Sequence, residues 1–294
     1  MSHDHGRPSH RRPLTVAFTL VSIVMVLEFL AGWWTGSLAL LCDWGHMATA
    51  ALGLGMALAA IMAAEKATRR GGHTYGLYRG EILAALANAT LLFLVGGYVL
   101  YEGINRLAEP PEVLTGPMLA VAVVGLIVNI VSWRLLRTGA EESLNVNGAY
   151  LEVLADLIGS VGVIVAAIVI SLTGWTIVDP IVGAAIGLFI LPRAWRLGSS
   201  ATRILLQAAP PHLDLGALAE SLEEIAGVVD VHDLHVWTLT SAMDVGTVHL
   251  VIEEEADPHP VLDQARVMLK EHGVAHATLQ VEPTSHRGCS ELTW

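Results

Sequence analysis

The chain has 294 residues, of which 53% are hydrophobic and 15% charged, and its formal net charge is −12. This much apolar side chain excludes a soluble globular protein of this length and indicates a membrane protein. The negative charge argues against nucleic acid as a partner, because proteins that bind phosphate backbones are basic.

The apolar residues gather into stretches long enough to cross a bilayer. A spanning helix needs about 20 mostly apolar residues. Six stretches meet this requirement: residues 14–34, 38–64, 80–104, 115–137, 145–172 and 178–197. The first stretch is too long for the hydrophobic part of a signal peptide and leads directly into the second, so we expect it to be retained.

After the last span the composition changes. Residues 1–203 carry 13 basic and 13 acidic side chains, whereas residues 204–294 carry 3 and 15. We therefore expect a short tail over residues 1–12, a six-helix membrane domain over 13–203 and an acidic soluble domain over 204–294, which would attract cations. Cys42 and Cys289, the only cysteines, lie in such different settings that they predict no disulfide framework.

The basic residues predict the orientation of the chain. The N-terminal tail and the loops at 65–79, 134–137 and 193–203 hold twelve Lys and Arg, and the opposite loops hold only Arg106. Cytoplasmic loops are enriched in Lys and Arg. We expect a multi-pass protein of the bacterial inner membrane, with both termini and the acidic domain in the cytoplasm.

Ionisable side chains within the predicted spans are candidates for function, because burial in lipid is unfavourable unless they face a partner or water. They are Glu28, Asp43, His46, Glu81, Glu152, Asp156 and Asp179. For Glu81, Asp179 and Asp43, which lie close to helix ends, interface anchoring or capping is an equal explanation. A single histidine such as His46 is also explained by packing and hydrogen bonding.

Glu152 and Asp156 are harder to explain by packing. Their i, i+4 spacing places both on one face of the fifth span. Two carboxylates this close in a low dielectric repel each other unless a cation or a shared proton lies between them. His46 would add an imidazole nitrogen, and this mixture of nitrogen and oxygen ligands is one that zinc prefers.

Several segments resemble those of one family of transporters. The segments are GSLALLCDWGHM, TYGLYRGEILAALANA, NVNGAYLEVLADLIGSVGVIVAA and VDPIVGAAIGLFIL. In this order they resemble the second, third, fifth and sixth helices of the cation diffusion facilitators, in the zinc branch of heavy-metal efflux proteins, and VHDLHVWTLT resembles the start of their cytoplasmic domain. The resemblance implies a dimeric metal/proton antiporter, with six membrane helices and a ferredoxin-like α+β cytoplasmic domain.

The resemblance is incomplete at the transport site. The family pattern is His-x-x-x-Asp on the second and fifth helices. Here His46 and Asp156 match, but Ala50 stands where an Asp is expected and Glu152 where a His is expected. Asp43, water or the second oxygen of Glu152 could supply the missing ligand. A site richer in oxygen is more tolerant of harder ions such as manganese.

We therefore expect a divalent metal cation/proton antiporter that exports zinc (Zn2+) by alternating access and is not an enzyme. Metal displaces protons from its ligands, and returning protons expel it on the far side. The chain contains neither G-x-x-x-x-G-K-[ST] nor H-E-x-x-H. Two alternatives remain: a transport-silent, metal-sensing or regulatory subunit, and a transporter that prefers Mn2+.

The acidic domain predicts the order α-β-β-α-β, with elements at 214–228, 230–240, 244–255, 259–273 and 275–283. His232, His249 and Glu282 resemble the family's cytoplasmic metal ligands, which implies bound zinc that draws two protomers into a homodimer. Period-2 alternation places His276 and Gln280 on the face of Glu282 and His235 opposite His232.

Other potential ligands lie in less regular segments. These are His3, His5, His10, His73, His286 and Cys289. They could bind metal or simply be solvated.

Overall fold

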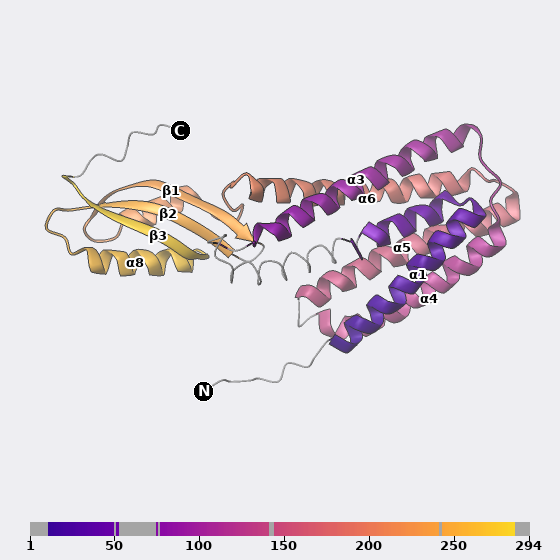
Figure 1. Ribbon diagram of the computed structural model, residues 1–294, viewed down its shortest axis with the longest axis horizontal. Coiled ribbons are helices and arrows are strands. Elements are labelled where there is room, and N and C mark those ends of the chain that lie inside the picture. Colours follow the sequence, from indigo (N-terminus) through magenta and orange to yellow (C-terminus); the bar gives the residue numbers. More distant parts are fainter. Residues whose placement is uncertain are drawn as a thin grey trace. The chain divides into compact units, whose positions relative to one another are not determined.

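The computed structural model describes residues 11–49, 51–52, 75, 77–140, 144–240 and 243–285. The described residues of Met1–Gly55 and Ala87–Leu197 form one compact unit, the helical unit, and those of Met56–Leu86 and Gly198–Trp294 form a second, the sheet unit. Figure 1 labels the elements of both units. Ala50 lies outside the described residues, so the position of the missing family ligand is not among them.

Long apolar helices make up the helical unit. They are α1 (Arg11–Thr35), α3 (Arg79–Ala108), α4 (Thr115–Ala140), α5 (Leu144–Thr173) and α6 (Val178–Leu205). Residues 79–86 of α3 and 198–205 of α6 belong to the sheet unit. Each contains a stretch long and apolar enough to cross a membrane. Five of the six expected spans are thus confirmed. The second expected span, 38–64, is helical over 38–49 and 51–52, and its remainder lies outside the described residues.

Small residues let these helices approach closely. Helices α3 and α6 meet at Gly96 and Gly103, where an added Cβ would lie 2.9 Å from Leu191 Cδ2 and 3.2 Å from Ala184 Cβ. Close backbone approach of this kind is how membrane helices gain contact energy, since lipid is as apolar as their side chains.

The surface of the helical unit suits a bilayer. Leu172 is 80% exposed, and Trp33, Trp34 and Trp175 are exposed at the end of α1 and just before α6. Tryptophan rings concentrate where the hydrocarbon region meets the lipid headgroups. Exposed apolar helices flanked by tryptophans are what a multi-pass membrane protein requires.

A tight turn joins α1 to the second helix. Helix α1 ends at Thr35 because Gly36 has a φ of +72°, a conformation in which a residue with a Cβ is strained. The Gly36 carbonyl accepts a hydrogen bond from Arg106 Nη1 at 2.7 Å. Helix begins again at residue 38, so α1 and the second helix form a hairpin with almost no loop.

Asp179, in the first turn of α6, holds the start of the second helix. Its carboxylate accepts hydrogen bonds from the Ser37 hydroxyl, from Leu38 N at 2.7 Å and from Ala39 N at 3.3 Å. The first N–H groups of a helix have no partner within the helix, and a carboxylate there also favours the helix dipole. For Asp179 the sequence is consistent with function, with interface anchoring or with capping, and the structure shows capping. The capped residue Ala39 lies 140 residues away from Asp179 in the sequence.

The sheet unit has the predicted order of elements. Helix α7 (Leu215–Glu223) precedes strands β1 (Val228–Thr240) and β2 (Met243–Ile252), and helix α8 (Pro258–Glu271) leads to β3 (Val274–Pro283). The sheet order is β1-β2-β3, with β1 and β2 antiparallel and β2 and β3 parallel. Helix α8 makes the crossover that a parallel pair requires and lies along the sheet (Figure 1).

One apolar core joins the sheet to its helices. Its fully buried members include Leu218 and Leu222 of α7, Leu250 of β2 and Leu269 of α8. Helix α7 ends earlier than the predicted 228, and Gly227 has a φ of +91° just before β1 begins. The expected α+β domain is confirmed, with small shifts at the ends of its elements.

We expect Asp179→Ala to lower the free energy of unfolding by about 1–3 kcal/mol, because it leaves buried N–H groups and a hydroxyl without their acceptor. The measurement is the thermal unfolding midpoint in detergent, which should fall. The control is Asp263→Ala, because the Asp263 side chain is 80% exposed. Equal midpoints for the two variants would contradict a stabilising role for this carboxylate.

Candidate metal sites

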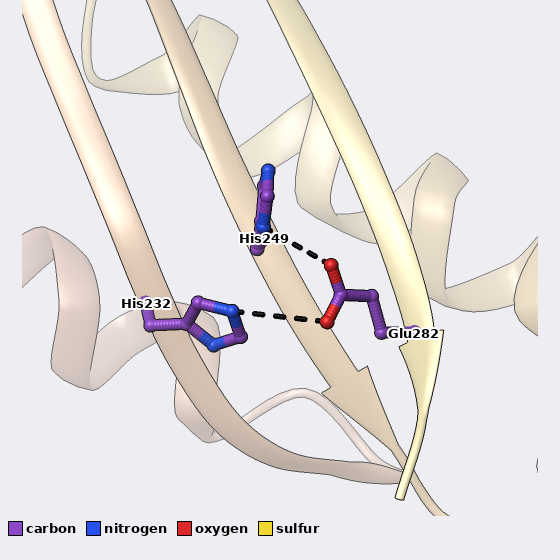
Figure 2. Close-up of side chains that lie close together, drawn as sticks. All are labelled: His232, His249 and Glu282. Atoms are coloured by element: carbon purple, nitrogen blue, oxygen red, sulfur yellow. Dashed lines mark ion pairs between the residues drawn. The ribbon is translucent and has the colours of Figure 1, made fainter. Parts of the chain in front are cut away.

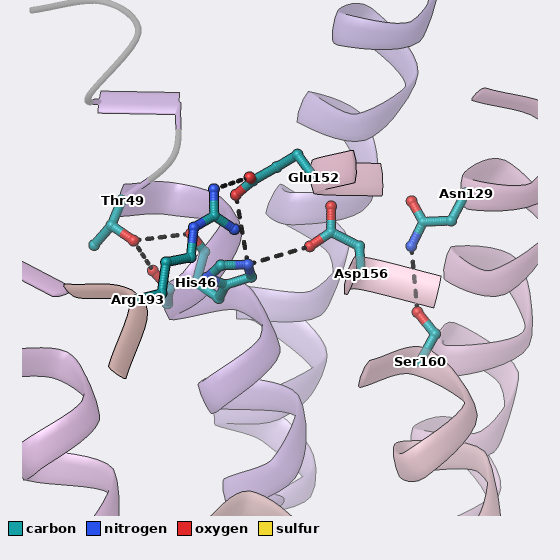
Figure 3. Close-up of polar contacts among 8 residues, drawn as sticks. His46, Thr49, Asn129, Glu152, Asp156, Ser160 and Arg193 are labelled. Atoms are coloured by element: carbon teal, nitrogen blue, oxygen red, sulfur yellow. Dashed lines mark hydrogen bonds and ion pairs between the residues drawn. The ribbon is translucent and has the colours of Figure 1, made fainter. Parts of the chain in front are cut away.

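Three of the residues singled out in the sequence meet inside the helical unit. His46 projects from the second helix toward α5, and its Nε2 lies 3.5 Å from Glu152 Oε1 and 3.8 Å from Asp156 Oδ1. In Figure 3, dashed lines join the His46 ring to both carboxylates. The i, i+4 spacing on α5 therefore does present both carboxylates to one partner. We refer to these three residues as the helix trio.

Two ligand atoms of the helix trio have no hydrogen-bond partner among the residues that the structure describes. His46 and Asp156 are 7% and 3% exposed. Within the described part of the chain, His46 Nδ1 and Asp156 Oδ1 have no hydrogen-bond partner. Buried polar atoms are nearly always paired, so unpaired atoms at one place require an explanation. A nitrogen and carboxylate oxygens of this kind are chemically suited to a divalent ion such as zinc.

The structure adds Arg193, which the sequence analysis counted only as an orientation signal. Arg193 of α6 forms an ion pair through Nη2 with Glu152 Oε2 (Figure 3). Its side chain is 47% exposed, whereas that of Glu152 is 22% exposed. Glu152 thus interacts with His46 through one oxygen and with Arg193 through the other.

Asp43 is buried, but it does not pair with His46 in the described structure. Its Oδ1 lies against Gly159 of α5, where an added Cβ would be 2.6 Å away. Asp43 is near enough to Asp156 to interact electrostatically. Its suggested place as the missing metal ligand stays a prediction.

More buried polar residues line α5 next to Asp156. Asn129 of α4 donates to Ser160 Oγ at 3.3 Å, and Ser160 lies one turn beyond Asp156. Glu28 of α1, which the sequence singled out, is 1% exposed and lies beside Gly125 of α4. Asn129 and Ser160 were missed because neutral polar residues in an apolar run give only a weak signal.

A second group of potential ligands lies on the sheet. His232 of β1 and His249 of β2 face each other in the antiparallel register, and Glu282 comes from β3. His249 Nδ1 is 3.1 Å from Glu282 Oε1, and His232 Nε2 is 3.8 Å from Glu282 Oε2 (Figure 2). One ligand atom from each residue fits within a mutual distance of 4.8 Å. We call these residues the sheet trio.

The surroundings of the sheet trio are acidic. Asp230 Oδ2 lies 3.3 Å from His232 Nδ1, and Asp233 Oδ2 lies 3.9 Å from His249 Nδ1. His232 Nε2 and His249 Nδ1 are buried without a hydrogen-bond partner among the residues described. Imidazole nitrogens that lie close to carboxylates in this way are suited to bind a cation together with them.

The remaining candidates lie elsewhere. Glu81 accepts a hydrogen bond from Thr240 at 2.6 Å within the sheet unit. Gln280 donates to Glu282 at 2.7 Å, as expected for one face, and His235 is exposed. His276 faces the ring of Tyr75. Several candidates lie outside the described residues: His3, His5, His10, His73, His286 and Cys289.

The fold and the two trios define a membrane protein of several spans, with ligands suited to cations in its helices and in an attached α+β unit. The family profile described as the cation efflux transmembrane domain matches residues 14–206, and that of the cation efflux protein cytoplasmic domain matches residues 210–284. The chain belongs to the cation efflux family, the cation diffusion facilitators, in its zinc and heavy-metal branch.

Curated relatives match along almost the whole chain. The metal cation efflux system protein CzcD of Cupriavidus metallidurans is 44% identical over 283 residues, 95% of this chain and 89% of the relative. The zinc transporter ZitB of Escherichia coli is 40% identical over 96% of this chain and 93% of the relative. A cadmium, cobalt and zinc/H(+)-K(+) antiporter of Bacillus subtilis is 34% identical over 97% and 93%. The predicted family is confirmed, and the protein is an integral multi-pass transporter, not an enzyme.

We expect Gly159→Ala to destabilise the helical unit by about 1–3 kcal/mol, because its Cβ would overlap the buried Asp43 carboxylate. Gly162→Ala is the matched control on α5, since its Cβ would meet Val182 Cγ1 at 3.4 Å, an ordinary contact. Thermal unfolding in detergent should separate the two variants. If Gly159→Ala unfolds no earlier than Gly162→Ala, the close approach of Asp43 to α5 is not a constraint.

Proposed function

We propose that the protein exports divalent transition-metal ions, zinc foremost, in exchange for protons, with the helix trio as its transport site. The observation that carries the proposal is that Glu152 and Asp156 both face His46 Nε2, and that Asp156 Oδ1 has no hydrogen-bond partner among the residues that the structure describes. The names of the relatives support it, since they describe metal cation efflux, zinc transport and cation/proton antiport.

Proton exchange follows from the chemistry of the ligands. A metal binds to a neutral imidazole and to ionised carboxylates, so binding releases the protons that these groups hold. With His46 neutral, Glu152 and Asp156 supply two negative charges, which balance one divalent ion. When the site opens to the other side of the membrane, returning protons expel the ion, as in the alternating access of secondary transporters.

The donor types bear on the choice of ion. The helix trio has one nitrogen ligand and two carboxylates, which suits zinc but is more oxygen-rich than a site with two histidines. A fourth ligand from Asp43 or water, or both oxygens of Glu152, would complete the shell. Manganese is therefore the competing ion to test against zinc.

We further propose that the sheet trio binds a regulatory zinc ion that draws two protomers together. The short distances within the sheet trio and the carboxylates of Asp230 and Asp233 around it support a cation there. The match of residues 210–284 to the family's cytoplasmic domain supports a homodimer. We also propose that both termini are cytoplasmic, as the distribution of Lys and Arg indicates. The bacterial origin of the relatives supports the bacterial inner membrane as the membrane.

A transport-silent, metal-sensing subunit is the second candidate. Two observations favour it: Ala50 stands at a ligand position of the family pattern, and in the described structure only the sheet trio brings three ligand atoms within 4.8 Å of one another. A sensor needs only to bind metal, whereas an exporter must move it across a bilayer.

Flux in proteoliposomes under an imposed pH gradient tests the main proposal. We expect zinc flux by the native protein and a reduction of at least about tenfold in Asp156→Ala, because a buried carboxylate ligand is lost. Glu102→Gln is the control, since Glu102 pairs with Arg106. A native protein that carries neither zinc nor manganese, and gains flux with Ala50→Asp, would instead identify the silent subunit.

Removal of the sheet histidines tests the regulatory site. We expect His232→Ala with His249→Ala to abolish the zinc-induced compaction of the dimer, because the remaining carboxylates bind zinc weakly without the two imidazoles. Small-angle scattering of the full chain with and without zinc measures this response. The control is His235→Ala, whose side chain is exposed. Compaction that persists in the double variant would exclude the sheet trio as its cause.

A further inference from the structure

We propose that Arg193 acts as a tethered cation that occupies Glu152 when no metal is bound and thereby sets the metal affinity of the helix trio. The inference rests on the proposed transport function, since it concerns the same site. It goes beyond that function by assigning a role to a residue that is not itself a metal ligand.

The geometry joins Arg193 to the site through a single carboxylate. Glu152 Oε2 pairs with Arg193, while Oε1 faces His46 Nε2 at 3.5 Å (Figure 3). A metal that used both oxygens of Glu152 would have to displace the guanidinium. A metal that used Oε1 alone would lie close to a second positive charge, which repels it.

The charge balance leads to the same conclusion. With His46 neutral, the two carboxylates and Arg193 leave a net charge of −1, which does not balance a divalent ion. Release of Glu152 by Arg193 restores a charge of −2. Arg193 always remains charged, so it leaves by movement and not by loss of a proton.

Arg193 has room for this movement. Its side chain is 47% exposed, and a long, flexible side chain can swing toward polar surroundings while its stem stays packed. Pro192 precedes it in α6 and removes one backbone hydrogen bond from the helix at that point. The ion pair with Glu152 can therefore exchange with metal through motion of one side chain.

Two consequences follow for transport. Each ion must compete with the Arg193 guanidinium for the Glu152 carboxylate. An ion that binds carboxylates weakly therefore does not displace the guanidinium. On release, the guanidinium returns to Glu152 and opposes rebinding of the ion. Arg193 thus weakens resting affinity and favours turnover.

The test is calorimetric titration with Zn2+ alone, on the purified full chain in a His232→Ala, His249→Ala background that removes the sheet histidines. We expect Arg193→Gln to tighten zinc binding about tenfold or more, because the competing charge is gone, and Arg193→Lys to remain close to native affinity. Arg137→Gln is the control, since Arg137 lies over the ring of Trp133, and it should not change affinity.

A double-mutant cycle shows whether the effect passes through Glu152. In a Glu152→Gln background, Arg193→Gln should tighten binding much less, because only the direct charge repulsion between Arg193 and the metal remains to be removed. The inference is overturned if Arg193→Gln binds zinc no more tightly than native protein, if Arg193→Lys tightens it equally, or if the gain is as large without the Glu152 carboxylate as with it. Loss of zinc binding in Asp156→Ala, measured alongside, shows that the helix trio itself binds metal. If that variant binds as native protein does, the transport site and this inference fall together.

Discussion

A charged group enclosed by apolar helices requires a partner, and this requirement organises the helical unit. The partners of Asp179 are the first N–H groups of the second helix, and the partner of Glu152 is Arg193. Among the residues that the structure describes, Asp156 Oδ1 has no hydrogen-bond partner, and the imidazole of His46 lies 3.8 Å from it. The groups with complete sets of partners hold the structure together, and the incompletely paired ones mark where an ion or a proton can enter.

The sequence could predict whatever depends on local periodicity. Apolar runs indicated five spans that the structure contains, because a spanning helix satisfies its own backbone hydrogen bonds. Alternation in the acidic segment predicted the strands, because every second residue of a strand faces the core. The i, i+4 spacing of Glu152 and Asp156 also placed both on one helix face. Each of these inferences needs only the geometry of a single element.

Contacts between distant elements were harder to predict. Arg193 and Glu152 are 41 residues apart, and nothing local in either segment specifies that their side chains meet. Arg193 also fitted the excess of basic residues in cytoplasmic loops. Because the orientation of the chain already explained this residue, nothing in the sequence suggested an ion pair. Asp43 lies on a suitable face of the second helix, yet Gly159 leaves space for its carboxylate against α5. The lack of a side chain at Gly159 thus leaves the space that the Asp43 carboxylate occupies.

The carboxylate of Asp179 joins the start of the second helix to the first turn of α6 by hydrogen bonds, whereas farther along the two helices share an apolar cluster that includes Cys42 and Ile190. His46 lies nine residues beyond Ser37, and Arg193 lies fourteen beyond Asp179, roughly 13 and 21 Å along their helices at about 1.5 Å per residue. When one helix rotates about a contact at its end, the displacement of a residue grows with the distance of that residue from the contact. A rotation of α6 by about 10° about the Asp179 contact would move Arg193 by roughly 4 Å and would hardly change the hydrogen bonds of Asp179. If these helices rotate relative to each other about the Asp179 contact, the displacement is therefore largest beside the proposed metal ligands.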